Sequence, residues 1–376
     1  MKSKFPGYVD NYFENNVLTS KKVLIAFDTN ILLNLYRYEK SISDDIISQI
    51  KSLKLNSFFE LWLPHQVALE FNLNRKNVIK NQERAVNLIE SKFRSFKKDI
   101  KGLSTVGGKN SELHPLKDEL VSPFNDIDKI IKSHLPKGTN SRGRDSVVKV
   151  VYELFDGIVG DSYTDEEMTM INREGKHRYQ HNIPPGFEDD AKESVYSYSG
   201  MEVNAKYGDF ILWKQLIDKA ILEKVTVVLV TGDEKDDWQC KEFGRVRPEL
   251  ITEFKLKTGQ EFYALTLPNF QRLFDKNLKH KLSPHTTTEI TALTKKDSKG
   301  WLNEVLAAFV HFGRALTLNE VNEYVIQNSD RDFPITWDGI IRKTIYNHCS
   351  DVKLYRGKKD LFKKVGTGLY ELRKYA

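Results

Sequence analysis

The chain has 376 residues, of which 40% are hydrophobic and 29% are charged, and its formal net charge is +6. This length exceeds what one hydrophobic core usually organises and predicts two domains, while the apolar content excludes a mainly disordered chain. No run of about 18 apolar residues occurs and the first residues form no apolar leader, so we expect a cytoplasmic protein without a membrane span. Cys240 and Cys349 lie far apart without Cys or His at ligand spacing, which argues against a zinc site or a disulfide framework.

Two buried strands are predicted in the first 65 residues. Val23 to Phe27 is a short apolar run, typical of a strand buried on both faces of a parallel sheet, and Asp28 follows at its carboxyl end. A second strand runs through Leu63, and Pro64 then begins a helix, where its missing N–H costs nothing. Glu70 therefore lies about two turns into that helix.

A long helical arm is predicted next, at about residues 74–158. Apolar residues recur there at spacings of three and four, the seam of a coiled-coil-like hairpin. The three series are Val86, Ile89, Phe93, Phe96 and Ile100; Leu120, Phe124, Ile127 and Ile131; and Val147, Val151, Leu154 and Ile158. The arm could fold on itself or pair with a second copy of the chain.

Residues 160–205 have little periodicity and predict an irregular excursion near the active face. Order resumes with a helix that carries Asp209 at its N-cap or first turn. Val225 to Thr231 is a β-branched run typical of an interior strand, and it ends in Gly232 and Asp233.

The first domain is predicted at 1–278, and the polar stretch 279–299 is predicted to be an interdomain linker. Residues 300–376 predict three helices and a β-hairpin, the winged-helix arrangement. From Ile341 onward ten Lys and Arg stand against three acids, which indicates a cationic face. Its candidate phosphate contacts are Arg342, Lys343, Lys358, Lys359, Lys363 and Lys364. A protein-contact role for this module remains the alternative.

Four acids stand where a strand ends or a helix begins: Asp28, Glu70, Asp209 and Asp233. Carboxylates gathered at the carboxyl ends of parallel strands make a cage for hard divalent cations, which supports phosphodiester hydrolysis. The alternative is four unrelated caps and surface acids. Secondary candidates are Asn30, Asp236 and Asp237. Asn30 could orient Asp28 or a metal-bound water, or serve a strand-to-helix turn; the two aspartates could bind a second metal or only begin a helix.

Guanidinium groups match phosphate oxygens well, and the candidates in the first domain are Arg75, Arg178, Arg245 and Arg247. Near Arg178, the rings of His177, Tyr179 and His181 could stack on bases. The alternative is that these side chains only solvate a loop.

Four ordered blocks and a fifth that follows them carry a family resemblance: FDTN after a strand, PHQVALEFNLNR, YGDFILWKQ and VTGDEKDDW, then RVRPELITEF. Across about residues 5 to 275 the chain resembles the bacterial PIN-like domain group related to PIN nucleases. The resemblance implies an α/β/α sandwich with a parallel central sheet. It also implies that the acidic tetrad named above binds Mg²⁺ or Mn²⁺ and that the chain is an endoribonuclease, with RNA the usual substrate ahead of DNA. The long helical insertion departs from compact PIN toxins.

The last 75 residues resemble winged-helix domains fused to bacterial restriction and defence enzymes, which implies a role in antiviral defence. A rival hypothesis is a non-catalytic regulator that binds nucleic acid through the winged helix. Asn30 stands where aspartate-nucleophile phosphatases need a second Asp, and no glycine-rich nucleotide loop of Walker type occurs.

Overall fold

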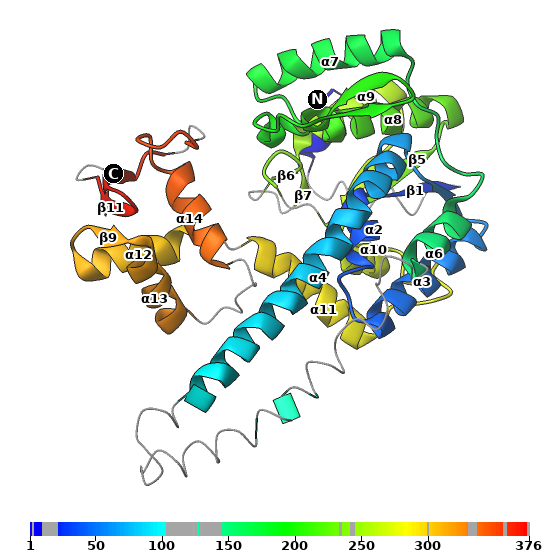
Figure 1. Cartoon of the computed structure of the whole chain (residues 1–376). Helices are drawn as coiled ribbons and strands as arrows, with labels where there is room; N and C mark the ends of the chain where they lie inside the picture. The colour runs from blue at the N-terminus through cyan, green and yellow to red at the C-terminus, as the bar shows by residue number, and fades with distance from the viewer. Residues whose placement is uncertain are drawn as a thin grey trace. The chain divides into compact units, whose positions relative to one another are not determined.

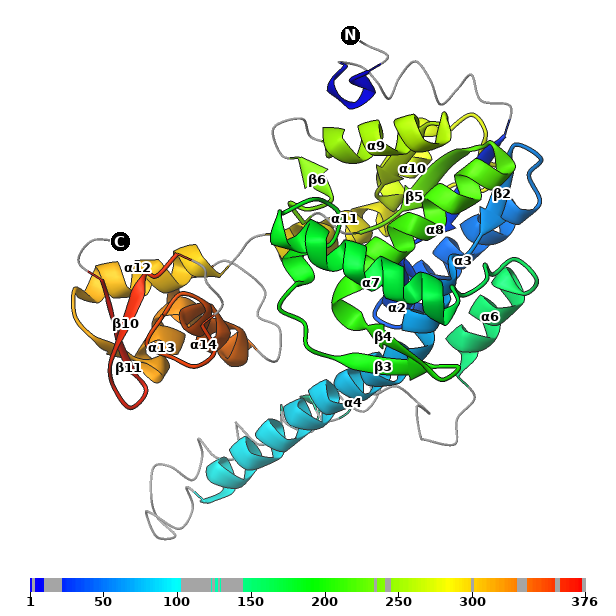
Figure 2. The same ribbon diagram turned by 90° about the horizontal axis from the view of Figure 1, so that it is seen from above.

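The structure is a computed structural model that describes residues 1, 4–9, 22–102, 123, 126–127, 129, 145–232, 235–240, 245–298, 301–329, 337–355 and 359–373. The chain divides into two compact units, Met1–Thr294 and Lys295–Ala376, shown in Figures 1 and 2. Across these residues, no helix is both long and apolar enough to cross a membrane.

The first unit is built on four parallel strands. They are, in sheet order, β2 (Phe59–Trp62), β1 (Val23–Phe27), β5 (Thr226–Val230) and β8 (Phe262–Leu265). Every residue of β1 and β5 is buried, which explains why both strands are continuous apolar runs. Val23 pairs with Phe59 on one side and with Thr226 on the other. The predicted parallel central sheet is confirmed, and the carboxyl ends of β1 and β5 lie side by side.

Helices pack on both faces of this sheet (Figures 1 and 2). They are α2 (Thr29–Asn34), α3 (Lys40–Lys54), α4 (His65–Gly102), α6 (Ser146–Phe155), α7 (Asp165–Gln180), α8 (Gly208–Glu223), α9 (Pro248–Thr258), α10 (Leu267–Leu273) and α11 (Pro284–Ser298). Short antiparallel pairs and three-residue 3₁₀ helices complete the unit: β3 (Val195–Tyr198) with β4 (Met201–Asn204), β6 (Gln239–Cys240) with β7 (Arg245–Val246), η1 (Pro6–Tyr8), η4 (Phe187–Asp189) and η5 (Ala205–Tyr207). The result is the α/β/α arrangement.

Helix α4 is a single helix of 38 residues, and its second half extends away from the sheet (Figure 1). Ile89 and Phe96 on its predicted seam are exposed. The first three residues of the third predicted series lie in α6, whose Val151 and Leu154 are buried in the core of the first unit, whereas Ile158 follows the helix. Helix α6 is therefore part of the packed body. Most of the second series lies outside the described residues, and Ile127 within it is exposed.

Residues 160–205 contain regular structure that the sequence analysis did not predict. Helix α7 begins with a capping box in which the Thr164 hydroxyl accepts from the Glu167 backbone and Glu167 accepts from the Thr164 backbone. The buried face of α7 includes Gly175 and Arg178 as well as apolar residues. Because that face is chemically mixed, it lacks the apolar periodicity that identifies most helices.

The stretch for which the sequence predicts a linker contains α11, and Ile290 on this helix is buried in the core of the first unit. Asp45 on α3 binds the segment that precedes α11. Its carboxylate accepts from Ser283 N at 2.8 Å and contacts His280 Nε2 at 2.8 Å.

The described residues of the second unit form three helices and a three-stranded antiparallel sheet. The helices are α12 (Leu302–Phe312), α13 (Leu318–Asn328) and α14 (Trp337–Asn347); the strands, in sheet order, are β10 (Phe362–Gly366), β11 (Leu369–Leu372) and β9 (Leu316–Thr317). Its own core includes Phe309, Ile341, Ile345, Phe362 and Tyr370. Cys349 is buried in this core.

Candidate active site

Asp28 is the first residue after β1 and the N-cap of α2. Its Oδ1 accepts from the Thr29 N–H at 2.6 Å, and its Oδ2 accepts from Asn30 Nδ2 and Thr231 Oγ1, each at 2.6 Å. Thr231 follows β5, so its contact with Asp28 is a direct result of the pairing of β1 with β5. These three donors fix the orientation of the carboxylate.

Asn30 joins the carboxyl ends of the two central strands. Its amide nitrogen donates to Asp28, and its Oδ1 accepts from the Gly232 N–H at 3.0 Å. The Asn30 side chain therefore contacts Asp28 from within the strand-to-helix turn. Asp233, the next residue after Gly232, lies outside the described residues.

Glu70 lies in the second turn of α4 and is tied to Asp28 through one intermediate residue. Its Oε2 accepts from Thr29 Oγ1 at 2.9 Å, and its Oε1 accepts from Gln66 Nε2 at 2.7 Å. Burial raises the pKa of Glu70, and the hydrogen bonds from Gln66 and Thr29 act in the opposite direction. A partly buried carboxyl in a polar cluster is a frequent mark of a functional site.

Gln66 positions Glu70 and was not predicted. Its backbone N–H donates to Gln215 Oε1 at 3.0 Å, and its side chain donates to Tyr196 Oη at 2.8 Å as well as to Glu70. The only sequence signal is its place four residues before Glu70, one helical turn away on the same face.

Asp209 stands in the first turn of α8, next to two glycines that allow close approach. Gly208 lies against Glu70, so that a Cβ there would collide with the Oε1 of that carboxylate. Gly186, with φ +89°, lies on the other side, and a Cβ there would be 2.9 Å from Asp209 Cβ. The backbone at the start of α8 is therefore in contact with the second acid of the site.

Three further aspartates belong to segments that lie close to Asp209 in the chain or in space. Asp237 is buried and accepts from the Glu188 N–H at 3.2 Å, whereas Asp236 is exposed. Asp189 was not predicted as a site residue; it pairs with Lys192 at 2.6 Å. Burial raises the pKa of the neighbouring phenol, Tyr179, and the charges of Asp209, Asp189 and Asp237 raise it further. The charges of three carboxylates therefore act on one buried phenol.

Residues 24–250, more than half of the chain, match the model of a family described as the PIN-like domain. The chain belongs to the PIN-like domain family. PIN domains are typically nucleases, so membership indicates a nuclease-type hydrolase that acts on nucleic acid. Comparisons with curated proteins and with solved structures gave no match.

PIN domains generally use divalent metal ions such as Mg²⁺ or Mn²⁺. Within the described part of this PIN-like domain, no group of three or more His, Cys, Asp or Glu side chains could by itself hold a metal ion. Asp28, Glu70 and Asp209 are linked through Thr29 and Gly208, and their side chains carry carboxylate oxygens, the donor type that such ions prefer. The donor chemistry fits such an ion, and the fourth predicted acid lies outside the described residues.

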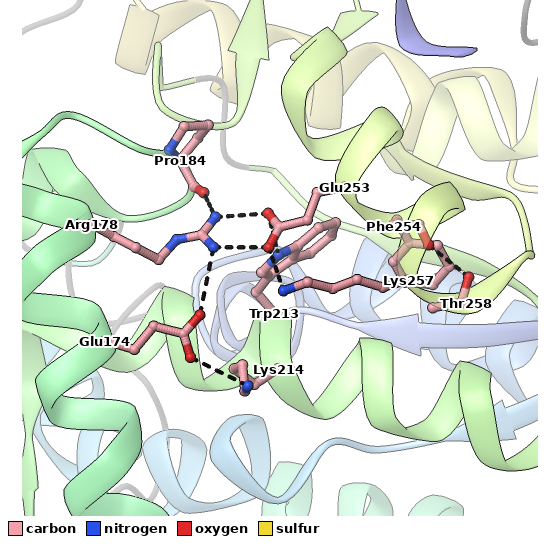
Figure 3. Close-up of polar contacts among 9 residues, drawn as sticks. All are labelled: Glu174, Arg178, Pro184, Trp213, Lys214, Glu253, Phe254, Lys257 and Thr258. Carbon is pink, nitrogen blue, oxygen red and sulfur yellow. Dashed lines mark hydrogen bonds and ion pairs between the residues drawn. The ribbon is translucent and has the colours of Figure 1, made fainter. Parts of the chain in front are cut away.

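Arg178 of the PIN-like domain does not present its guanidinium to solvent (Figure 3). It is 6% exposed and donates to both carboxylate oxygens of Glu253, each at 2.8 Å. It also donates to Pro184 O, and its guanidinium lies 4.9 Å from the centre of the Phe210 ring. Glu253 accepts further bonds from Trp213 and Lys257. Arg178 therefore joins α7 to α8 and α9, and this replaces the phosphate-binding role considered from the sequence.

Two other candidate arginines of the first unit, Arg75 and Arg247, are also engaged in structural contacts. Arg75 pairs with Asp145 at 2.7 Å and so ties α4 to the start of α6. Arg247 precedes α9, donates to Asp236 O at 2.7 Å and pairs with Glu249. The backbone of Arg245 lies in β7, and its side chain is outside the described atoms.

The aromatic and histidine rings near Arg178 and at the start of α4 differ in exposure and in their contacts. His177 and His181 are exposed, with ring centres 4.5 Å apart, whereas Tyr179 is buried and donates to Lys206 O. His65 packs edge-on against Tyr198.

On the second unit the basic candidates lie at the surface. Arg342, Lys343, Lys359, Lys363 and Lys364 are exposed, and Lys358 lies outside the described residues.

Proposed function

We propose that this protein is a divalent-metal-dependent endonuclease that hydrolyses phosphodiester bonds, with RNA preferred over DNA. The observation that carries the proposal is the contact of Thr29 with both Asp28 and Glu70 at the carboxyl edge of the parallel sheet of a PIN-like domain. Residues 28 and 70 belong to separate segments, and shared donors bring them together.

The ligands in this proposal are Asp28, Glu70, Asp209 and Asp233, and the cofactor is Mg²⁺ or Mn²⁺. A bound ion of this kind acidifies water and stabilises charge on a phosphoryl oxygen. The protein's own contribution is orientation, through Thr29, Asn30 and Gln66. Each Glu70 oxygen accepts one bond from these residues, and since a carboxylate oxygen has two lone pairs, each retains one for a cation.

The second unit is proposed to be a winged-helix module that places the nuclease on nucleic acid or on a protein partner. Its element order, α12, β9, α13, α14, β10 and β11, supports this interpretation. Exposed basic residues on α14 and β10 supply contacts for a phosphate backbone. A role in bacterial antiviral defence is proposed from the families that the two parts resemble. A cytoplasmic location is proposed from the composition. Pairing of two copies through α4 is part of the same proposal.

Cleavage assays test the nuclease directly. The full chain is incubated with end-labelled single-stranded RNA, single-stranded DNA and duplex DNA, with Mg²⁺, Mn²⁺ or a chelator. We expect metal-dependent shortening of RNA, and a loss of at least about 100-fold in rate in Asp28→Asn and in Asp209→Asn, the scale of removing a principal charge-stabilising group. Asp156→Asn, an exposed acid at the end of α6, is the matched control. Unchanged rates in both site variants would refute the mechanism.

The basic surface of the second unit favours one other candidate, a non-catalytic regulator that binds nucleic acid. Such a protein would retard the labelled probe in a gel without shortening it under any metal condition.

A further inference from the structure

Asp189, the last residue of η4, lies between two lysines from different segments. Lys192 Nζ is 2.6 Å from Asp189 Oδ2, and Lys235 Nζ is 3.4 Å from Oδ1 and 3.5 Å from Oδ2. The Asp189 side chain is only 13% exposed, whereas those of Lys192 and Lys235 are 49% and 37% exposed. The Asp189 carboxylate is thus more buried than the two lysine side chains, which reach the solvent.

This lysine pair lies beside the acidic site. Burial has the largest effect on the pKa of Glu70, and Lys192 and Asp189 are the charged side chains that act on it, lowering and raising it respectively. Gly186, three residues before Asp189, packs against Asp209, and the Glu188 N–H donates to Asp237. Lys235 lies four positions after Thr231, the residue beyond β5 that donates to Asp28.

The charge arrangement suits a phosphodiester. Several carboxylates at the site repel a polyanionic substrate, so binding needs cations at the margin of the acidic cluster. An ammonium group is a compact charge with three hydrogen-bond donors. Two ammonium groups that bind one carboxylate between them can bind a phosphate in the same way. Asp189 occupies the position of that anion in this structure.

We propose that Lys192 and Lys235 bind a backbone phosphate of the nucleic-acid substrate next to the acidic site, and that this phosphate replaces Asp189 between the two ammonium groups. The identity of the ligand as nucleic acid rests on the proposed function. The alternative is a purely structural ion-pair cluster.

Binding measurements separate this inference from cleavage. Fluorescence anisotropy of a labelled single-stranded RNA is measured with the full chain carrying Asp28→Asn, without added metal, between about 50 and 200 mM salt. Lys192→Met and Lys235→Met are each expected to weaken binding by about 3- to 10-fold, and each lowers the salt slope by about 0.7, the value for one phosphate contact on a single strand. Lys192→Arg with Lys235→Arg should keep the slope.

Two further variants distinguish a phosphate-binding lysine pair from a purely structural ion-pair cluster. Lys219→Met removes a lysine paired with Glu223 on α8 and should leave affinity and slope unchanged. Asp189→Asn removes the competing anion, so the RNA affinity should rise. A structural cluster predicts a lower melting temperature for Asp189→Asn with no gain in affinity.

An unchanged salt slope in the double Lys→Met variant, with a normal circular dichroism spectrum, would overturn the inference, as would a wild-type chain that binds neither RNA nor single-stranded DNA. Lysine-dependent binding without cleavage by the metal-loaded wild type would leave the lysine site standing and remove the nuclease proposal.

Discussion

The hydroxyl of Thr29 donates to Glu70 Oε2 at 2.9 Å, across 41 positions of sequence. Thr29 is buried, and its backbone N–H donates to Asp28. The first residue of α2 thereby sets the spacing between a carboxylate at the end of β1 and a carboxylate on α4.

Thr29→Val, which removes this hydroxyl at nearly constant volume, should destabilise the first unit by about 1–3 kcal/mol, because one buried carboxylate oxygen loses its donor. Cleavage should fall as well, since Glu70 is no longer held toward Asp28. Urea unfolding and the initial cleavage rate with Mn²⁺ measure the two effects. Thr29→Ser retains the hydroxyl and should keep most of both; equal losses in the two variants would show that volume matters and the hydrogen bond does not.

Gly208→Ala should impair the site more than the fold. The added Cβ collides with the Glu70 carboxylate, which must move away from the start of α8. We expect cleavage to fall by about 10-fold or more, consistent with displacement of a group positioned for catalysis. The control is Gly339→Ala in α14, where the nearest atom to a new Cβ is 3.9 Å away. That change should stabilise the second unit by about 0.5–1 kcal/mol and leave cleavage unaltered.

The ion pair between Arg178 and Glu253 predicts a strong effect on stability. Removing one partner takes away the main counter-charge of the other, so Arg178→Met or Glu253→Gln should cost about 3–5 kcal/mol in urea unfolding. The double variant Arg178→Met with Glu253→Met should lose less than the sum, because neither charge is left alone. Lys257→Met removes an exposed partner of Glu253 and should cost less than about 1 kcal/mol. Additive losses would show that the pair is not coupled.

The same pair predicts a pH dependence. Burial opposes ionisation of Glu253, but the hydrogen bonds and charges of Arg178 and Lys257 outweigh it and lower the pKa of Glu253 to about 2. Because an unfolded Glu has a pKa of about 4.3, the stabilisation is fully present above that pH and is lost as the pH falls toward about 2. The difference in unfolding midpoint between wild type and Glu253→Gln should therefore shrink below about pH 4.3. A constant difference across that range would contradict the assignment.

The strands could be predicted because each is a continuous apolar run of the kind that only a doubly covered parallel sheet buries. Helix α7 could not be predicted from periodicity, since Gly175 and Arg178 lie on its buried face. Its one local signal, Thr164 with Glu167, is short and easily overlooked. The Asn30 side chain could be placed next to Asp28, because only Thr29 separates the two residues in a strand-to-helix turn.

The features that could not be predicted depend on contacts between residues that are distant in the sequence. A guanidinium suits a carboxylate as well as a phosphate, and nothing local indicates that Arg178 meets Glu253, 75 positions away. Asp189 with Lys235 is a similar case at 46 positions. Sequence spacing identifies residue types that support a reaction, whereas the choice of partner depends on which helices pack together.

Asp28 and Thr231 lie 203 positions apart and yet share a hydrogen bond. While the chain is being synthesised, the ribosome must therefore complete more than half of the protein before this edge of the sheet can form. A product truncated before β5 would carry Asp28, Glu70 and Asp209 but would lack Thr231, the donor that orients Asp28 from the neighbouring strand.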